Sequence, residues 1–385
     1  HTMRKIQETL QAQSTTTQDI MYIAFELSNS TWRLAFSDSN KKRHVTIKAR
    51  DLKQLEIEII KAKRRFGLKD NVQIKSCYEA GRDGFWLHRY LLSKGIDNLV
   101  VDSSSIEVNR RKRRVKSDRL DAGNLLRLLM RYHGNERQVW KVVTAPTVKE
   151  EDARHLHREI ETLLRERTRY RNRIKALLVQ HGLDVKNPSR KNFLKVLNAL
   201  RTWDGQVLPE SMKARVVREH ERLRMIEDHI KLLKKEREQR VKSKETASFQ
   251  QVAQLRELCG IGVNSSWVFV MEFFGWRKFR NRREVAALAG LTPTPYDSGG
   301  SQREQGISKA GNKRIRTMAV EIAWCWLRFQ PHSKFSRWFN ERFASGGSRM
   351  RRIGIVALAR KLLISLWRYL EHGVIPEGAI IKSAS

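Results

Sequence analysis

Met21-Tyr-Ile-Ala-Phe-Glu-Leu27, followed after three residues by Thr31-Trp-Arg-Leu-Ala-Phe36, is the stretch that decides the fold of the N-terminal part of the chain. Both segments are rich in β-branched and aromatic side chains, and the Ser-Asn-Ser between them is typical of a turn. They therefore predict two neighbouring strands. Glu26 interrupts the first segment. Because a carboxylate between Phe25 and Leu27 is costly to bury without a partner, Glu26 is a candidate functional residue.

Further elements are predicted on the C-terminal side of these strands. Hydrophobic periodicity and turn residues indicate a strand at 43–48, a helix at 51–66, a strand at 72–78, a helix at 84–94, a strand at 99–101 and a helix at 118–132. The strand at 72–78 delivers Glu79 at its carboxyl end. The order β-β-β-α-β-α-β-α predicts an α/β domain with a mixed sheet, in the order of the RNase H-like (RuvC-like) fold.

The rest of the chain is predicted to be helical. Helical spacing of apolar residues indicates long helices at 150–182 and 210–244, joined by a connector at 183–210, which would form an antiparallel hairpin or a dimerising coiled coil. A mainly α domain follows. The predicted organisation has four parts. They are a mobile arm beginning with a tag remnant at 1–19, an α/β domain at 20–148, a coiled-coil middle at 149–248 and a C-terminal domain at 249–385.

The composition points to a polyanionic partner. The 385 residues contain 77 Lys plus Arg against 41 Asp plus Glu, a formal net charge of +36, and such self-repulsion is best offset by nucleic acid. An anionic membrane surface is the weaker alternative, since no apolar run is long enough to span a bilayer and no signal peptide is visible. Cys77, Cys259 and Cys325 are too dispersed for a zinc site or a disulfide framework. We expect a cytoplasmic, nucleoid-associated bacterial protein.

Four acids are candidates for a metal site. The stretch Asn109 to Ala122 runs from cations into Asp118 and Asp121, whose i, i+3 spacing puts both on one helix face. With Glu26 and Glu79 they would converge outside the carboxyl ends of the strands, where Mg²⁺ (or Mn²⁺) prefers carboxylate oxygens. The alternatives are a solvated helix start for the aspartates and a polar strand end for Glu79. Phosphate contacts are expected from Arg110, Arg111, Lys112, Arg113, Arg114 and Lys116.

A second candidate centre is Tyr296-Asp-Ser-Gly-Gly-Ser-Gln302. Glycines leave the hydroxyl of Ser298 open to a substrate, although a serine needs activation to become a nucleophile, and a flexible loop is the commoner meaning of such a sequence. The cations after it could hold a scissile phosphate: Arg303, Lys309, Lys313, Arg314 and Arg316. Two further interpretations concern the C-terminal domain. Gly260 and Gly262 resemble a helix-hairpin-helix turn that approaches phosphate. Trp324, Trp326, Trp338 and Trp367 are expected to pack in the core, with base stacking as the alternative.

These motifs, taken together, resemble a known family. Cys77-Tyr-Glu-Ala-Gly81, Asp102-Ser-Ser-Ser-Ile-Glu-Val108 and Lys116-Ser-Asp-Arg-Leu-Asp-Ala122 are similar to the N-terminal domain of the IS110/IS1111 insertion-sequence transposases. Ala289-Gly-Leu-Thr-Pro293, Ser298-Gly-Gly300 and Gly306-Ile-Ser-Lys-Ala-Gly-Asn312 are similar to their C-terminal transposase domain. The motifs occur in the family's order and span most of the chain.

The resemblance implies a specific chemistry. Ser298 would be the nucleophile and Glu26, Glu79, Asp118 and Asp121 the DEDD-type metal-binding acids of a RuvC-like domain, with Glu26 in place of the family's aspartate. It also implies a recombinase guided by a structured bridge RNA that pairs with target and donor DNA, a covalent phosphoserine intermediate, and a homodimer or homotetramer with composite sites. Two alternatives remain open: a RuvC-like metal-dependent junction nuclease that uses water, and a non-catalytic RNA- or DNA-binding protein.

Overall fold

The computed structural model describes residues 19–107, 118–298 and 301–382. The chain divides into two compact units, His1–Pro146 and Thr147–Ser385. The expected arm at 1–19 lies almost entirely outside the described residues. Within the described ranges, no helix is both long and apolar enough to cross a membrane.

The first unit is built on the predicted mixed sheet. Its five strands are β1 (Ile20–Leu27), β2 (Thr31–Ser37), β3 (Lys42–Lys48), β4 (Gln73–Glu79) and β5 (Asp97–Val101). They lie in the order β3-β2-β1-β4-β5. β1 is antiparallel to β2 and parallel to β4, and β5 is parallel to β4. The apolar first strand is therefore the centre of the sheet, as its continuous hydrophobic sequence requires.

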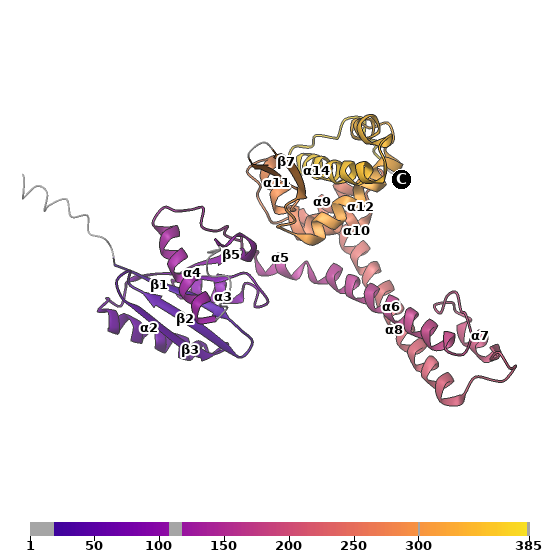
Figure 1. Ribbon diagram of the computed structural model, residues 1–385, viewed down its shortest axis with the longest axis horizontal. Coiled ribbons are helices and arrows are strands. Elements are labelled where there is room, and N and C mark those ends of the chain that lie inside the picture. Colours follow the sequence, from indigo (N-terminus) through magenta and orange to yellow (C-terminus); the bar gives the residue numbers. More distant parts are fainter. Residues whose placement is uncertain (1–18, 108–117, 299–300, 383–385) are drawn as a thin grey trace, which may run out of the picture. The chain divides into compact units, whose positions relative to one another are not determined.

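Helices cover both faces of this sheet (Figure 1). Alternate residues of β1, such as Ile23 and Phe25, pack against α2 (Leu52–Phe66) and α3 (Trp86–Ser93). Tyr22 and Ala24, whose side chains lie on the opposite face of β1, pack against α4 (Asp118–His133). Asp51 begins α2 by accepting a hydrogen bond from the Gln54 amide, as expected for an N-cap. Glu26 therefore belongs to the face that α4 covers.

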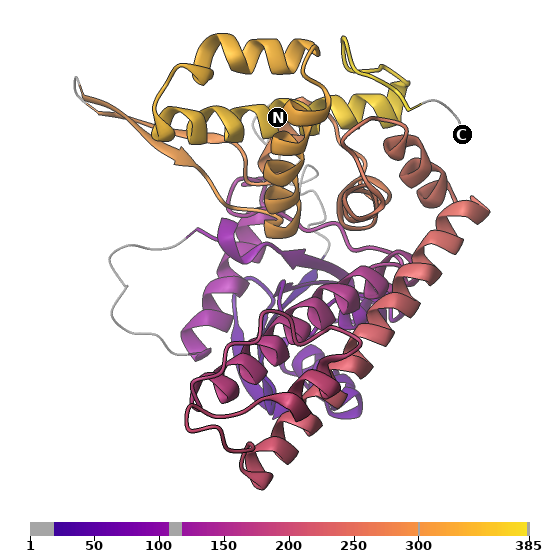
Figure 2. The ribbon, with the colours of Figure 1, turned by 90° about the vertical axis from the view of Figure 1, so that its right-hand side faces the viewer.

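The second unit begins with a helical hairpin, formed by α6 (His155–Val179) and α8 (Glu210–Ser243) (Figure 2). The predicted single helix at 150–182 is interrupted, because α5 (Val148–Asp152) ends before Arg154. The predicted connector contains one more helix, α7 (Phe193–Ala199). Phe193 and Leu197 of α7 are buried with apolar residues of α6 and α8, so this end of the hairpin has its own small core.

The remaining helices enclose a larger core with the other end of the hairpin. They are α9 (Ala247–Arg256), α10 (Val263–Phe269), the π-helix η3 (Val270–Phe274), α11 (Arg282–Leu288), α12 (Lys313–Phe329), α13 (Lys334–Phe339), the π-helix η4 (Asn340–Ala344) and α14 (Ser348–His372). Leu156 and Ile160 of α6 and Val241 of α8 belong to the same core. The C-terminal part is thus mainly helical, as predicted.

The expected loop around Ser298 is instead a β-hairpin, made of β6 (Pro293–Ser298) and β7 (Ser301–Ile307). Pro293 and Pro295 argue against a strand by sequence, because proline lacks an amide hydrogen. In a two-stranded ribbon each strand is an edge, so that missing donor can face outward without loss of a ladder hydrogen bond. The register shifts between the two prolines.

Two further expectations concern the second unit. The contact of Gly260 and Gly262 with phosphate stays a prediction. Gly260 has a φ of +86°, and a Cβ atom there would lie 3.3 Å from Cβ of Phe329. This glycine allows the turn to pack closely on α12. Trp324 was expected in the core and is 43% exposed, whereas Trp326, two residues later on the opposite side of α12, is fully buried.

Candidate catalytic site

Glu26 and Glu79 lie side by side at the carboxyl edge of the first unit's sheet. The parallel register of β1 and β4 ends with Phe25 opposite Tyr78, so each glutamate is the next residue on its strand. Neighbouring strands are separated by about 4.8 Å, and equivalent positions of parallel strands face the same side. The sheet register therefore brings together two acids that are far apart in the sequence.

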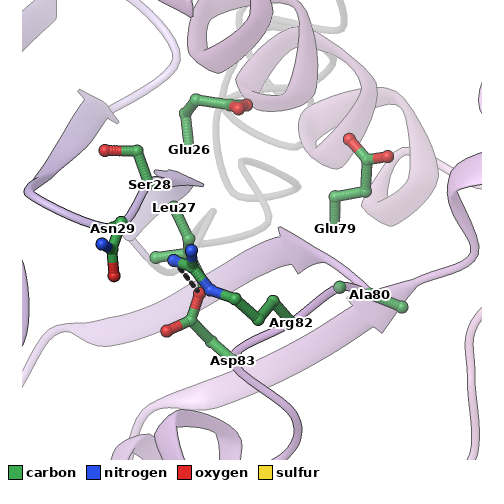
Figure 3. A pocket seen from close by; sticks show the side chains of 9 residues that line it. Glu26, Leu27, Ser28, Asn29, Glu79, Ala80, Arg82 and Asp83 are labelled. Atoms are coloured by element: carbon green, nitrogen blue, oxygen red, sulfur yellow. Dashed lines mark ion pairs between the residues drawn. The ribbon is translucent and has the colours of Figure 1, made fainter. Parts of the chain in front are cut away.

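Both glutamates line one open cavity of about 430 Å³. Figure 3 shows their carboxyl groups extended to the same side of the strands that carry them. Glu79 is exposed and Glu26 is half-buried. The rest of the lining comes from the segments that follow the two strands, Leu27 to Asn29 and Ala80 to Asp83. The cavity is open to solvent.

The opposite side of the cavity carries an ion-paired cluster that the sequence did not indicate. Asp83 is almost fully buried, and one of its carboxylate oxygens lies 3.6 Å from Arg50 and the other 3.7 Å from Arg82. Arg50 also donates to the carbonyl of Asn29 at 3.2 Å. These contacts join the turns after β1 and β4. Only the position of Arg82 and Asp83 in the turn after β4 could have suggested their place.

Helix α4 crosses one face of the sheet. Cys77 Sγ donates to the Leu125 carbonyl at 3.9 Å, and Lys75 Nζ lies 3.1 Å from His133 Nδ1. Hence α4 runs antiparallel to β4 in direction but crosses the sheet obliquely, over β1 and β2. Its beginning lies on the β3 side, where Gly123 is beside His44, and its end reaches β4 at His133.

The donors in this region fit a hard divalent cation in type, since they are carboxylates. Among the described side chains no group of three His, Cys, Asp or Glu residues is close enough to hold a metal ion. The described pair, Glu26 and Glu79, needs further ligands. For Asp118 and Asp121 the structure describes the backbone but not the side chains, and Arg110, Arg111, Lys112, Arg113, Arg114 and Lys116 lie outside the described residues.

Ser298 is the last residue of β6, paired in register with Ser301 across the end of the hairpin. Figure 2 shows this hairpin projecting from the helices of the second unit. The structure describes the backbone at Ser298 and Arg303, and not their side chains.

The other cations near the hairpin have different surroundings. Lys309 and Lys313 are exposed. Arg314 Nε donates to Glu161 Oε2 of α6 at 2.9 Å, and 41% of its side chain is exposed. Arg316 differs from these, because its Nη1 donates to the backbone carbonyls of Lys309, at 2.9 Å, and Ala289, at 3.3 Å. The structure therefore places Arg316 against the backbone at the base of the hairpin.

Comparisons with known proteins decide the family. Residues 252–336 match the model of the IS116/IS110/IS902 transposase family. The chain is 40% identical to a putative transposase, y4rJ, of Sinorhizobium fredii over 94% of this chain and 95% of the relative. The chain belongs to the IS110/IS1111 family of insertion-sequence transposases. The transposase of the element IS1111A from Coxiella burnetii is 24% identical over 92% of this chain and 91% of the relative.

Membership in this family has direct consequences. A transposase binds DNA, cleaves it and rejoins it, so the positive charge of this transposase has a polyanionic partner. The family model covers the segment from α9 to the beginning of α13, which includes the hairpin with Ser298. The relatives at 40% and 24% identity extend over both units.

Proposed function

We propose that this transposase cuts and rejoins the DNA of an insertion sequence through Ser298, assisted by a divalent cation at Glu26, Glu79, Asp118 and Asp121. The observation that carries the proposal is the register of β1 and β4, which aligns Glu26 and Glu79 beside one cavity. The strand order β3-β2-β1-β4-β5, with α4 antiparallel to β4 in direction, supports an RNase H-like interpretation of the first unit.

Ser298 would be the covalent nucleophile. Its Oγ attacks a DNA phosphorus, the bond from phosphorus to the 3′ oxygen breaks, and the serine proton leaves to a base while the departing 3′ oxygen gains one. The products are a 5′ phosphoserine and a free 3′ hydroxyl. In the second step, a 3′ hydroxyl of the exchanged strand attacks the phosphoserine, which restores the serine. Mg²⁺ bound by the four acids would stabilise the charge that develops on the phosphate oxygens.

The cations of the chain would hold the nucleic acids. Lys309 and Lys313 are exposed beside the base of the hairpin and can contact phosphates, as would Arg303 and the run from Arg110 to Lys116. We further propose that a structured bridge RNA guides the choice of target and donor DNA, and that the protein works as a homodimer or homotetramer. The support for RNA guidance is family membership and the net charge of +36.

The serine chemistry is tested with a nicked suicide DNA that traps a covalent adduct. Wild type should form a protein–DNA adduct in Mg²⁺, Ser298→Ala should form none while keeping its DNA affinity, and the matched control Ser301→Ala should form it normally. Cleavage by Ser298→Ala at the wild-type rate would contradict the serine mechanism and favour a junction nuclease that uses water. Absence of cleavage by wild type with any divalent metal would favour a non-catalytic binding protein.

RNA guidance is tested separately by purifying the full chain at low salt. We expect a defined RNA to co-purify, with an absorbance spectrum dominated by nucleic acid, and sequencing of that RNA should reveal segments complementary to the element's donor and target DNA. A protein that carries no RNA, yet still recombines its substrates, would refute the guided mechanism and leave the serine chemistry standing.

A further inference from the structure

The base of the β6–β7 hairpin is held by several backbone hydrogen bonds. The Asn312 amide donates to the Leu288 carbonyl at 2.8 Å, the Lys309 amide to Gly290 at 3.2 Å, and the Ser308 amide to Thr292 at 2.9 Å. These bonds join the chain entering β6 to the chain leaving β7. They fix the two ends of the hairpin to each other, between the end of α11 and the beginning of α12.

Two glycines make this close approach possible. Gly290 and Gly311 have φ values of +70° and +127°, a region that other residues rarely adopt. A Cβ atom at Gly290 would lie 2.5 Å from Nη1 of Arg316, and one at Gly311 would overlap the carbonyl oxygen of Leu288. The Arg316 guanidinium thus occupies the space that a side chain at residue 290 would need.

Arg316 links this base to a rigid helix. Its Nη1 donates to the carbonyl of Ala289, which directly follows α11, and to that of Lys309, two residues after β7. Arg316 lies in the first turns of α12, which Asn312 caps by accepting from the amides of Arg314 and Ile315. Ile315 and Ala319 anchor α12 in the main core of the second unit. The core therefore holds the base of the hairpin through the Arg316 side chain in addition to the backbone hydrogen bonds.

We propose that Arg316 is a positioning residue for Ser298, an inference that rests on the proposed function of that serine. Ser298 lies five residues beyond Pro293, about 16 Å along the strand, so a rotation of about 4° at the base displaces it by about 1 Å. A displacement of this size can lower a reaction rate about 100-fold. Without the guanidinium, the hairpin keeps its strand pairing and loses its fixed direction.

The test compares Arg316→Gln with Arg328→Gln, a matched change on the exposed face of α12. At saturating suicide DNA, Arg316→Gln should form the serine adduct about 10- to 100-fold more slowly, with unchanged DNA affinity and unchanged salt dependence of binding. Arg328→Gln should match wild type. Arg316→Lys, which retains one donor, should fall between them, and millimolar guanidinium should partly restore Arg316→Ala.

Hydrogen exchange on the full chain gives a readout that is independent of the serine chemistry. The amides of Ser308 and Lys309 should exchange faster in Arg316→Gln, while amides of α12 and α14 keep their protection.

A wild-type rate of adduct formation by Arg316→Gln overturns the inference. So does a parallel loss of DNA affinity, which would make Arg316 a phosphate ligand, or a loss of cooperative thermal unfolding, which would make its role purely structural. If Ser298→Ala still forms the adduct, the proposed function fails. The hydrogen-exchange result then still tests, by itself, whether Arg316 holds the base of the hairpin.

Discussion

Two carboxylate sites in this transposase have opposite surroundings. Glu272, in the π-helix η3, is 3% exposed and is enclosed by protein donors: His157 Nε2 lies 2.8 Å from one of its oxygens, and Arg158 contacts both oxygens at 2.7 and 2.9 Å. Glu26 and Glu79 instead line an open cavity at a sheet edge. Protein donors enclose the first carboxylate, whereas half-buried Glu26 and exposed Glu79 line a cavity that is open to solvent.

The difference shows that carboxylates buried among cations need not mark a catalytic centre. Burial alone raises the pKa of Glu272, but the hydrogen bonds from His157 and Arg158 outweigh it and hold this pKa well below its usual range. Glu272 remains ionised and ties η3 to α6, which joins the hairpin to the C-terminal core. A carboxylate that binds a metal must instead keep its oxygens within reach of an incoming ion.

The largest expected effect is on the activity of a sheet-edge variant. Glu79→Gln should lower DNA cleavage in Mg²⁺ by at least about 100-fold, since even outer-shell changes at metal sites cost about 10- to 100-fold. Its free energy of unfolding should change by no more than about 0.5 kcal/mol, because Glu79 is exposed. Glu56→Gln, an exposed change on α2, is the matched control for cleavage assays. Normal cleavage by Glu79→Gln would show that this edge of the sheet does not hold the catalytic metal ion.

An intermediate effect is expected on the stability of the enclosed site. Glu272→Gln should lower the free energy of unfolding of the second unit by about 3 kcal/mol, since it leaves His157 and Arg158 without their anionic partner. Urea unfolding, with exposed Glu321→Gln on α12 as the control, measures this change. A variant as stable as wild type would show that the buried carboxylate does not tie the two elements together.

The same variant should alter the pH dependence of stability. Because the folded-state pKa of Glu272 is depressed, its contribution is complete above the ordinary glutamate pKa, about 4.3, and decreases as the pH falls below it. Wild type should therefore lose stability of the second unit in this acidic range, and Glu272→Gln should lack that part of the loss. Parallel pH profiles of the two proteins would argue against the depressed pKa.

The smallest expected effect concerns the first unit. Its stability should begin to decrease at a higher pH than the stability of the second unit. Desolvation, reinforced by the nearby Lys75, lowers the pKa of His133 from 6.5 to about 4. The unfolded chain then binds more protons than the folded one between these values, so stability is complete above pH 6.5 and decreases as the pH falls towards 4. Hydrogen exchange in β4 and α4 should report this, and His133→Asn should flatten the slope. An unchanged slope would assign the acid sensitivity to other groups.

Much of the first unit was predictable because its elements are locally encoded. The β-branched and aromatic content around Ile23 and Phe25 predicted the first strand, and the Asp51 cap predicted the start of α2. The predicted strand at 99–101 is also confirmed, since β5 ends at Val101 and a short 3-10 helix follows. The hairpin at Ser298 was missed because proline disfavours a strand by local propensity, and only the pairing of two exposed edges makes it acceptable.

The sequence by itself determined the order of the elements, the positions of acids at strand ends, the excess of cations and the family motifs, because these depend on neighbouring residues along the chain. Only the tertiary structure decided that Glu26 and Glu79 lie at neighbouring strand ends and line one cavity. It also decided that Arg316 donates hydrogen bonds to backbone carbonyls. Strand register and the direction of a long side chain depend on contacts between distant segments. An arginine carries the same charge whether it contacts DNA or holds a backbone segment, so its position in the sequence cannot distinguish the two roles.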